Sequence, residues 1–268
     1  MNEPDAWLNT VTFAGEALER LPYSQIREVL QEHPLARVTG LFDADEVLRV
    51  RRNIEARFDA RNDRKHDPRD TDAVRTNMQK LQIGAVTADY SIPRFLRMLF
   101  NPIFADDAHG MRDSFIKLAR FRNLLYELPR DFAVFGTEKG LWTASRLHQY
   151  PRGGGFMAAH IDDVTKRVAM NAGLKDYYQM YLLMSKKGVD FFKGGAFIDR
   201  GGRGIEYEAA CEIGDIMVYS GRSRHGVADI DPLEPLDLVT FSGRVVAMVT
   251  LFAHLQPSDF DVLNENLG

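Results

Sequence analysis

Apolar residues recur at helical spacing through the first half of the chain and at strand-like spacing through the second half. Up to about residue 128, positions three and four apart repeatedly carry aliphatic or aromatic side chains, which indicates amphipathic helices. We expect helices over residues 14–21, 24–30, 41–58, 91–100 and 115–125 and a short strand over residues 37–41. Pro22 should end the first helix, and the expected N-caps of later ones are Ser24, Asp43 or Asp45, and Ser91.

From about residue 131 the pattern changes to short apolar runs separated by glycine-rich turns. The expected strands are residues 132–135, 143–150, 179–184, 195–198, 205–207, 215–219 and 244–252. Many short strands of this kind indicate a double-sheet jelly roll or a barrel. Because no linker divides the sequence, we expect one domain over residues 1–268, mainly β with flanking helices (α+β). Its residues 1–130 should form a mostly helical flank and lid, outside a β core at residues 131–256.

Residues 57–72 are dense in charges of both signs and almost free of apolar side chains. Such a stretch is usually a solvated loop, because it has little apolar surface to bury. The alternative is a lid over a binding site that recognises a polar substrate, with Arg75 at its far end as one contact. The sequence leaves both interpretations open.

Composition excludes several classes of protein. Hydrophobic residues make up 45% of the 268-residue chain and charged residues 27%, as in ordinary globular proteins. A net charge of −4 gives no electrostatic basis for binding nucleic acid. No apolar run is long enough to span a membrane, and the first residues do not resemble a signal peptide. The single cysteine, Cys211, fits a reducing compartment, so we expect a cytoplasmic protein; the sequence does not indicate its oligomeric state.

Three residues carry the strongest chemical signal. His160 and Asp162 lie two residues apart, and His225 follows in a later segment. Two imidazoles and one carboxylate form the facial triad of non-haem Fe(II) sites, which leaves the opposite coordination positions open. His-X-Asp alone is more often a surface pair, but here the glycines at 153–155 permit a tight turn before it, and Gly226 permits close approach of backbone after His225.

A second group of polar residues precedes the triad. Arg146, His148 and Tyr150 alternate along one expected strand, so their side chains share one face. That face either lines the interior of the barrel as a polar wall or is solvated. His148 is also an alternative metal donor, although its spacing to Asp162 matches no recognised geometry.

The stretch from Arg146 to Phe252 resembles the Fe(II)/2-oxoglutarate-dependent dioxygenases, in particular their prolyl-hydroxylase-like and phytanoyl-hydroxylase-like branches. The matching segments are 146–154, 160–162, 192–197, 214–219, 225–227 and 243–245, in the order and rough spacing of that family. The resemblance implies a double-stranded β-helix (jelly-roll, cupin-like) core. It also implies Fe(II) held by His160, Asp162 and His225, with 2-oxoglutarate as cosubstrate and O₂ as oxidant. The N-terminal part carries no motif of the family.

The family also needs a cation for the distal carboxylate of 2-oxoglutarate, and the resemblance assigns this role to Arg244. Arg244 lies farther from His225 than the family usually shows, because an acidic, proline-containing segment at 229–237 intervenes. Val246 stands where the family often has serine, so the hydroxyl partner must come from elsewhere, either Tyr150 or Thr250. Tyr150 and Arg146 are the further expected cosubstrate-binding residues. Arg222 and Arg224, beside His225, are expected to be loop or substrate contacts.

The implied reaction is hydroxylation of an unactivated C–H bond, with decarboxylation of 2-oxoglutarate to succinate and CO₂. Asp162 occupies the position that related halogenases leave open for chloride, which argues against halogenation. The expected substrate is a small polar molecule, either a free amino acid or a specialised-metabolite intermediate. Three alternatives remain: the same chemistry giving desaturation or cyclisation, a cupin-like metalloenzyme that does not use 2-oxoglutarate, and a non-catalytic binding barrel.

Overall fold

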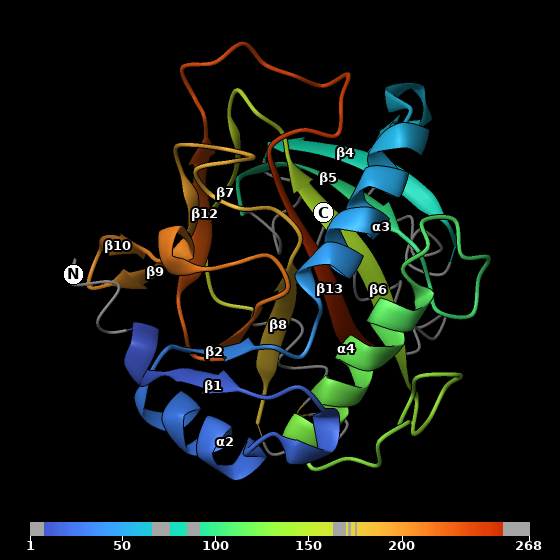
Figure 1. Cartoon of the computed structure of the whole chain (residues 1–268), viewed down its shortest axis with the longest axis vertical. Coiled ribbons are helices and arrows are strands. Elements are labelled where there is room, and N and C mark those ends of the chain that lie inside the picture. The colour runs from blue at the N-terminus through green and yellow to red at the C-terminus, as the bar shows by residue number, and fades with distance from the viewer. Residues whose placement is uncertain are drawn as a thin grey trace, which may run out of the picture.

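The computed structural model describes residues 8–65, 76–84, 92–162, 170, 173–174 and 176–253 (Figure 1). Its helices are α2 (Tyr23–Glu32), α3 (Ala44–Arg57) and α4 (Arg112–Leu125), with 3-10 turns η1 (Leu18–Arg20), η2 (Ala60–Asn62) and η4 (Glu208–Ala210). The strands are β1 (Thr12–Ala14), β2 (Leu35–Thr39), β3 (Arg64–Lys65), β4 (Met78–Gly84), β5 (Arg94–Phe100), β6 (Leu141–Tyr150), β7 (Gly155–His160), β8 (Tyr178–Leu183), β9 (Gly195–Arg200), β10 (Arg203–Glu206), β11 (Ile216–Ser220), β12 (His225–Ile230) and β13 (Arg244–Ala253). No helix in these ranges is long and apolar enough to cross a membrane.

The thirteen strands form one hydrogen-bonded sheet in the order β1-β2-β11-β8-β13-β6-β5-β7-β12-β9-β10, with β4 also on β5 and β3 on β4. Its longest pairing is antiparallel, between β13 and β6, and runs from Arg244 opposite Tyr150 to Ala253 opposite Leu141. β12 lies between β7 and β9. The sheet therefore brings the segments around residues 150, 160, 225 and 244 together, although they are distant in the sequence.

Alternation along β13 separates the core from the interior of the barrel. Val245, Ala247 and Val249 belong to the main hydrophobic cluster, which also contains the buried faces of α2, α3 and α4. Four residues at the intervening positions, Arg244, Val246, Met248 and Phe252, line a cavity on the other side of the strand. Successive side chains of a strand point to opposite faces, so helical packing on one face fixes which residues reach the cavity.

Helix α3 shows how the sequence specifies this outer layer. Its N-cap is Asp43, whose carboxylate accepts a hydrogen bond of 2.9 Å from the backbone N–H of Glu46. Val47, Val50 and Ile54 are buried at helical spacing, and each contributes about 1.5–3 kcal/mol to folding through the apolar surface it removes from water. The expected helix is thus confirmed, and its N-cap is Asp43, not Asp45.

Other sequence expectations for the helices have mixed outcomes. The expected helices at 24–30 and 115–125 correspond to α2 and α4, and the strand at 37–41 to β2. Ser24 lies inside α2, whose N-cap position is Pro22. The helix expected over 14–21 is wrong, because residues 12–14 pair with β2 and only the short turn η1 follows.

The clearest error concerns residues 91–100, which were expected to form a helix. Residues Arg94–Phe100 form β5, and Ser91, the expected cap, lies outside the described residues. β5 pairs with β4 along its full length and with β6 and β7 at its two ends, so sheet pairing overrides the local pattern. The strand expected at 132–135 is also wrong: this segment is a turn in which Ala133 has a φ of 53°, outside the strand region.

The charged segment after α3 is only partly described. Asp63 accepts hydrogen bonds from the buried guanidinium of Arg97 on β5, at 2.6–3.0 Å, and a further one of 2.7 Å from Gln79 on β4. Asp63 therefore ties the segment to the sheet, while its neighbours Arg61, Asn62 and Arg64 are exposed to solvent. Residues 66–75, including Arg75, lie outside the described residues, so the lid remains a prediction.

Candidate metal centre

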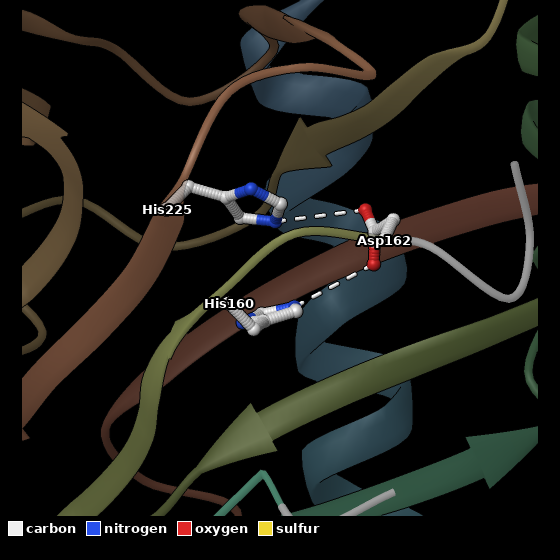
Figure 2. A group of neighbouring side chains, drawn as sticks. All are labelled: His160, Asp162 and His225. Carbon is white, nitrogen blue, oxygen red and sulfur yellow. Dashed lines mark ion pairs between the residues drawn. The ribbon is translucent and has the colours of Figure 1, made fainter. Parts of the chain in front are cut away.

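His160, Asp162 and His225 meet at one point inside the barrel (Figure 2). His160 is the last residue of β7 and His225 the first of β12, and the two are paired across these antiparallel strands with ring centroids 4.5 Å apart. Asp162 lies between them, with its carboxylate oxygens 3.5 Å from Nε2 of His160 and 3.6 Å from Nε2 of His225. Among the described residues this is the only group of His, Cys, Asp and Glu side chains close enough to share a metal.

Hydrogen bonds to the backbone orient both imidazoles. Nδ1 of His160 lies 2.9 Å from the carbonyl oxygen of Ala158, and Nδ1 of His225 lies 3.0 Å from that of Ser223. A carbonyl oxygen only accepts, so each Nδ1 carries the proton and each Nε2 presents its lone pair toward Asp162. Burial lowers the pKa of His225, which keeps this ring neutral and able to bind a metal.

The carboxylate of Asp162 is ionised. Burial opposes its charge, but the nearby imidazoles of His160 and His225 outweigh burial and lower the pKa of Asp162. Two imidazoles and one carboxylate fit a divalent metal of borderline softness. Ligand atoms about 2 Å from one ion lie about 3 Å from each other when adjacent, so the observed separations need only small side-chain adjustments.

The triad opens into a cavity of about 240 Å³. Arg146, His148 and Tyr150 all line it, so this face of β6 points into the barrel. Nε of Arg146 donates a hydrogen bond of 2.9 Å to Nε2 of His148. Burial, together with the charges of Arg146 and Arg244, lowers the pKa of His148 well below its usual value, so His148 is a neutral acceptor. It is not part of the metal-ligand group, and the sequence alternative of His148 as a metal donor is not supported.

Arg244 also lines the cavity, but it is engaged by an acidic residue that the sequence did not identify. Its Nε lies 3.0 and 2.9 Å from the two carboxylate oxygens of Glu208, and its Nη2 lies 2.6 Å from Oε1. Both side chains are 2% exposed. Burial opposes the charge of Glu208, but Arg244 outweighs it and holds the pKa of Glu208 below its ordinary value. The guanidinium also lies over the rings of Tyr150 and Tyr181, at 5.0 and 5.1 Å.

A chain of buried tyrosines connects this ion pair with the metal centre. The hydroxyl of Tyr181 donates to Glu208 at 3.0 Å and lies 2.9 Å from the hydroxyl of Tyr207, which lies 2.9 Å from that of Tyr219. The ring of Tyr219 stacks on His225, with centroids 4.3 Å apart and an interplanar angle of 27°. Sequence reasoning could not find these residues, because Glu208 is not distinguished in the sequence from the exposed Glu206 two residues earlier.

The other candidate residues make different contacts from those that the sequence predicted. Thr250 accepts a hydrogen bond of 3.2 Å from Nη1 of Arg146, and Tyr150 presents its ring, not its hydroxyl, to Arg244. The hydroxyl of Tyr150 instead contacts Sδ of Met157 at 3.7 Å. Arg222 and Arg224 are exposed and do not line the cavity, and Arg224 pairs with Asp199 at 2.8 Å.

No protein-family model and no curated protein sequence matches this chain. Among solved structures it is similar to a prolyl hydroxylase from Trichoplax adhaerens in complex with a hypoxia inducible factor peptide fragment, with a TM-score of 0.52 and 11% identity over 86% of this chain and 89% of that chain. It is also similar to SnoN, a non-heme alpha ketoglutarate dependent epimerase from nogalamycin biosynthesis, with a TM-score of 0.50 and 11% identity over 86% of this chain and 82% of that chain.

These likenesses concern the fold. The chain has the double-stranded β-helix of the Fe(II)/2-oxoglutarate-dependent oxygenases, as the motifs between Arg146 and Phe252 predicted. The three triad residues lie where the strand order brings the ends of β7 and β12 together.

Proposed function

We propose that the protein is a non-haem Fe(II)- and 2-oxoglutarate-dependent oxygenase. The observation that carries the proposal is the triad itself: the Nε2 atoms of His160 and His225 converge on the carboxylate of Asp162 at the wall of a cavity (Figure 2). When bound there, Fe(II) with 2-oxoglutarate and O₂ supplies the oxidising power to hydroxylate an unactivated C–H bond, and 2-oxoglutarate leaves as succinate and CO₂. The shared fold supports this assignment as an analogy.

The residues of the chain contribute binding and orientation. His160, Asp162 and His225 would hold the iron on one face. Arg244 would bind the distal carboxylate of the cosubstrate through N–H groups on Nη1, because Glu208 occupies Nε and Nη2. The rings of Tyr150 and Tyr181, on either side of Arg244, exclude water from this end of the cavity. A carboxylate–guanidinium contact is stronger in such a dry environment.

We further propose that the substrate is a small polar molecule, either a free amino acid or a specialised-metabolite intermediate, and that the protein is cytoplasmic. The cavity of about 240 Å³ has the size for a small molecule rather than for a folded partner. The carboxylate of Asp162 occupies the coordination position that halide would need, so hydroxylation is the expected outcome rather than halogenation.

One observation favours a second candidate, a cupin-like metalloenzyme that does not use 2-oxoglutarate. Glu208 already supplies Arg244 with a carboxylate, so a cosubstrate carboxylate must share the guanidinium with a buried anion. The second candidate keeps the metal triad but gives Arg244 a structural role.

Anaerobic titration with Fe(II) and 2-oxoglutarate distinguishes the two. The proposal requires a weak visible metal-to-ligand charge-transfer band when 2-oxoglutarate joins the iron, and iron-dependent succinate formation in air. Asp162→Ala should abolish both. A folded, iron-loaded wild-type protein that gives no band would exclude the 2-oxoglutarate assignment and favour the cupin-like alternative.

A further inference from the structure

Three arginines line the cavity, Arg94, Arg146 and Arg244, and the partners of Arg146 differ from those of Arg244. Arg146 is half-buried on β6, and its contacts are with neutral groups: Nε donates to His148 at 2.9 Å and Nη1 to Thr250 at 3.2 Å. Among the described residues no carboxylate lies within ion-pair distance of Arg146. Arg244, by contrast, is neutralised by Glu208. A guanidinium in a cavity, held by neutral acceptors, is a binding group for an anion.

Strand register places Arg146 and Arg244 at different depths. Arg146 lies opposite Met248, four positions beyond Arg244 on β13 and roughly 13 Å along a strand, and its hydrogen-bond partner Thr250 lies two positions further. The side chains of Val246 and Met248 line the cavity between these levels. The two guanidinium groups therefore serve different parts of the cavity.

Arg146 lines the same cavity as the metal triad. Thr250 also accepts a hydrogen bond of 3.4 Å from Gln179, and Gln179 is the cross-strand partner of Tyr219, which stacks on His225. A cosubstrate that extends from the metal toward Arg244 leaves Arg146 for a second molecule.

The surroundings of Arg146 are apolar. Phe100 on β5 and Met248 on β13 are its cross-strand partners, and its guanidinium lies 5.7 Å from the ring centroid of Phe252. All three side chains line the cavity. A ligand that binds here meets one planar cationic fork within an apolar wall, which matches a carboxylate attached to an apolar body.

We propose that Arg146 binds the carboxylate of the substrate, so that the protein acts on a small carboxylic acid with an apolar portion. This assignment rests on the proposed function and narrows its substrate class, which includes amino acids. It also gives Arg146 a role different from the cosubstrate contact that the sequence predicted. The substrate carboxylate accepts hydrogen bonds from the N–H groups that remain on Nη1 and Nη2, while His148 holds Nε and Thr250 holds one N–H of Nη1.

Matched acids and amides test the proposal. Calorimetric titrations of protein loaded with Fe(II) and 2-oxoglutarate under nitrogen would compare hexanoate with hexanamide, 3-phenylpropanoate with 3-phenylpropanamide, and L-leucine with L-leucinamide. We expect at least one acid to bind about tenfold or more tightly than its amide, because a charge-assisted pair is lost in the amide. Arg146→Gln should remove this preference, and Arg146→Lys, which keeps the charge without the fork, should keep part of it.

The control is Arg222→Gln, an exposed arginine near the metal centre that does not line the cavity and should leave the preference unchanged. Circular dichroism and thermal unfolding would confirm that each variant folds. The proposal is overturned if no acid binds more tightly than its amide, or if the preference survives in Arg146→Gln. It is also overturned if Arg146→Gln weakens binding of 2-oxoglutarate and leaves the acid preference intact, since Arg146 is then a cosubstrate residue.

Failure of the proposed oxygenase function would give different results from failure of the acid site. If the wild-type protein gives no charge-transfer band with 2-oxoglutarate, the same titrations on protein loaded with Zn(II) alone still measure the acid preference and its dependence on Arg146. The acid site and the oxygenase assignment can therefore fail separately.

Discussion

Glu208 holds Arg244 with two oxygens and two nitrogens in the interior of the barrel, at distances of 2.6–3.0 Å. Glu208 follows β10 in the short turn η4, and Arg244 begins β13. The same carboxylate accepts from the backbone N–H of Ala196 at 2.9 Å and from the hydroxyl of Tyr181 at 3.0 Å. Four donors thus satisfy one buried anion, which makes its pairing with Arg244 a fixed element of the fold.

Removal of one member of this pair should destabilise the protein more than removal of both. Glu208→Ala leaves the guanidinium of Arg244 buried without a counter-charge, and we expect a loss of about 3–5 kcal/mol in the free energy of unfolding. The double variant Glu208→Leu with Arg244→Met replaces the pair by apolar volume and should lose less. Urea unfolding of the three proteins measures this difference. Additive losses in the double variant would show that the pair is not electrostatically coupled.

The tyrosine chain predicts a decline of stability at alkaline pH. Burial raises the pKa of Tyr181 and of Tyr207 well above the ordinary value of 10.0, so both stay protonated in the folded protein. The unfolded chain releases these protons above pH 10.0, so stability is full below this pH and falls as pH rises, at about 1.4 kcal/mol per pH unit for each tyrosine. Urea unfolding across this range tests the slope. Tyr207→Phe should make the slope shallower, and an unchanged slope would contradict the prediction.

Metal affinity should depend on the charge of Asp162. Asp162→Asn keeps the size of the side chain but replaces an anionic ligand with a neutral amide, so we expect Fe(II) affinity to fall by about tenfold or more. Anaerobic calorimetry with Fe(II) measures this affinity. Asp199→Asn is the matched control, because Asp199 pairs with Arg224 outside the cavity. Equal affinities of the two variants would mean that iron binds elsewhere.

The cap of α3 can be tested with two neighbouring aspartates. Asp43→Ala removes the carboxylate that accepts from the N–H of Glu46, and we expect a loss of about 1 kcal/mol in the free energy of unfolding. Asp45→Ala lies in the first turn, where a carboxylate contributes about 0.3–1 kcal/mol through the helix dipole. Thermal and urea unfolding would rank the two. A larger loss for Asp45→Ala would contradict the capping assignment.

The sequence predicted the triad because its three residues carry their chemistry in their identity and stand beside glycines that mark turns. It predicted the strand from Arg244 because Arg244 is followed by a long, almost uninterrupted apolar run. The helix prediction for residues 94–100 was wrong because a serine, a proline and an apolar run are as typical of a helix start as of a strand. Only the pairing with β4 and β6 makes this segment a strand. Glu208 could not be predicted, since its role depends on a contact with a residue far along the chain.

Strand β13 separates the helical layer from the cavity, so substitutions on one side of the strand affect residues on the other. Val245, Ala247 and Val249 pack against the helices on one side, while Val246, Met248 and Phe252 line the cavity on the other. Protein interiors are close-packed, so a change of volume at Val249, or in α4 where it contacts this strand, shifts the residues that face the substrate. Substitutions in the helical layer therefore provide a route to altered specificity that leaves every ligand of the metal in place.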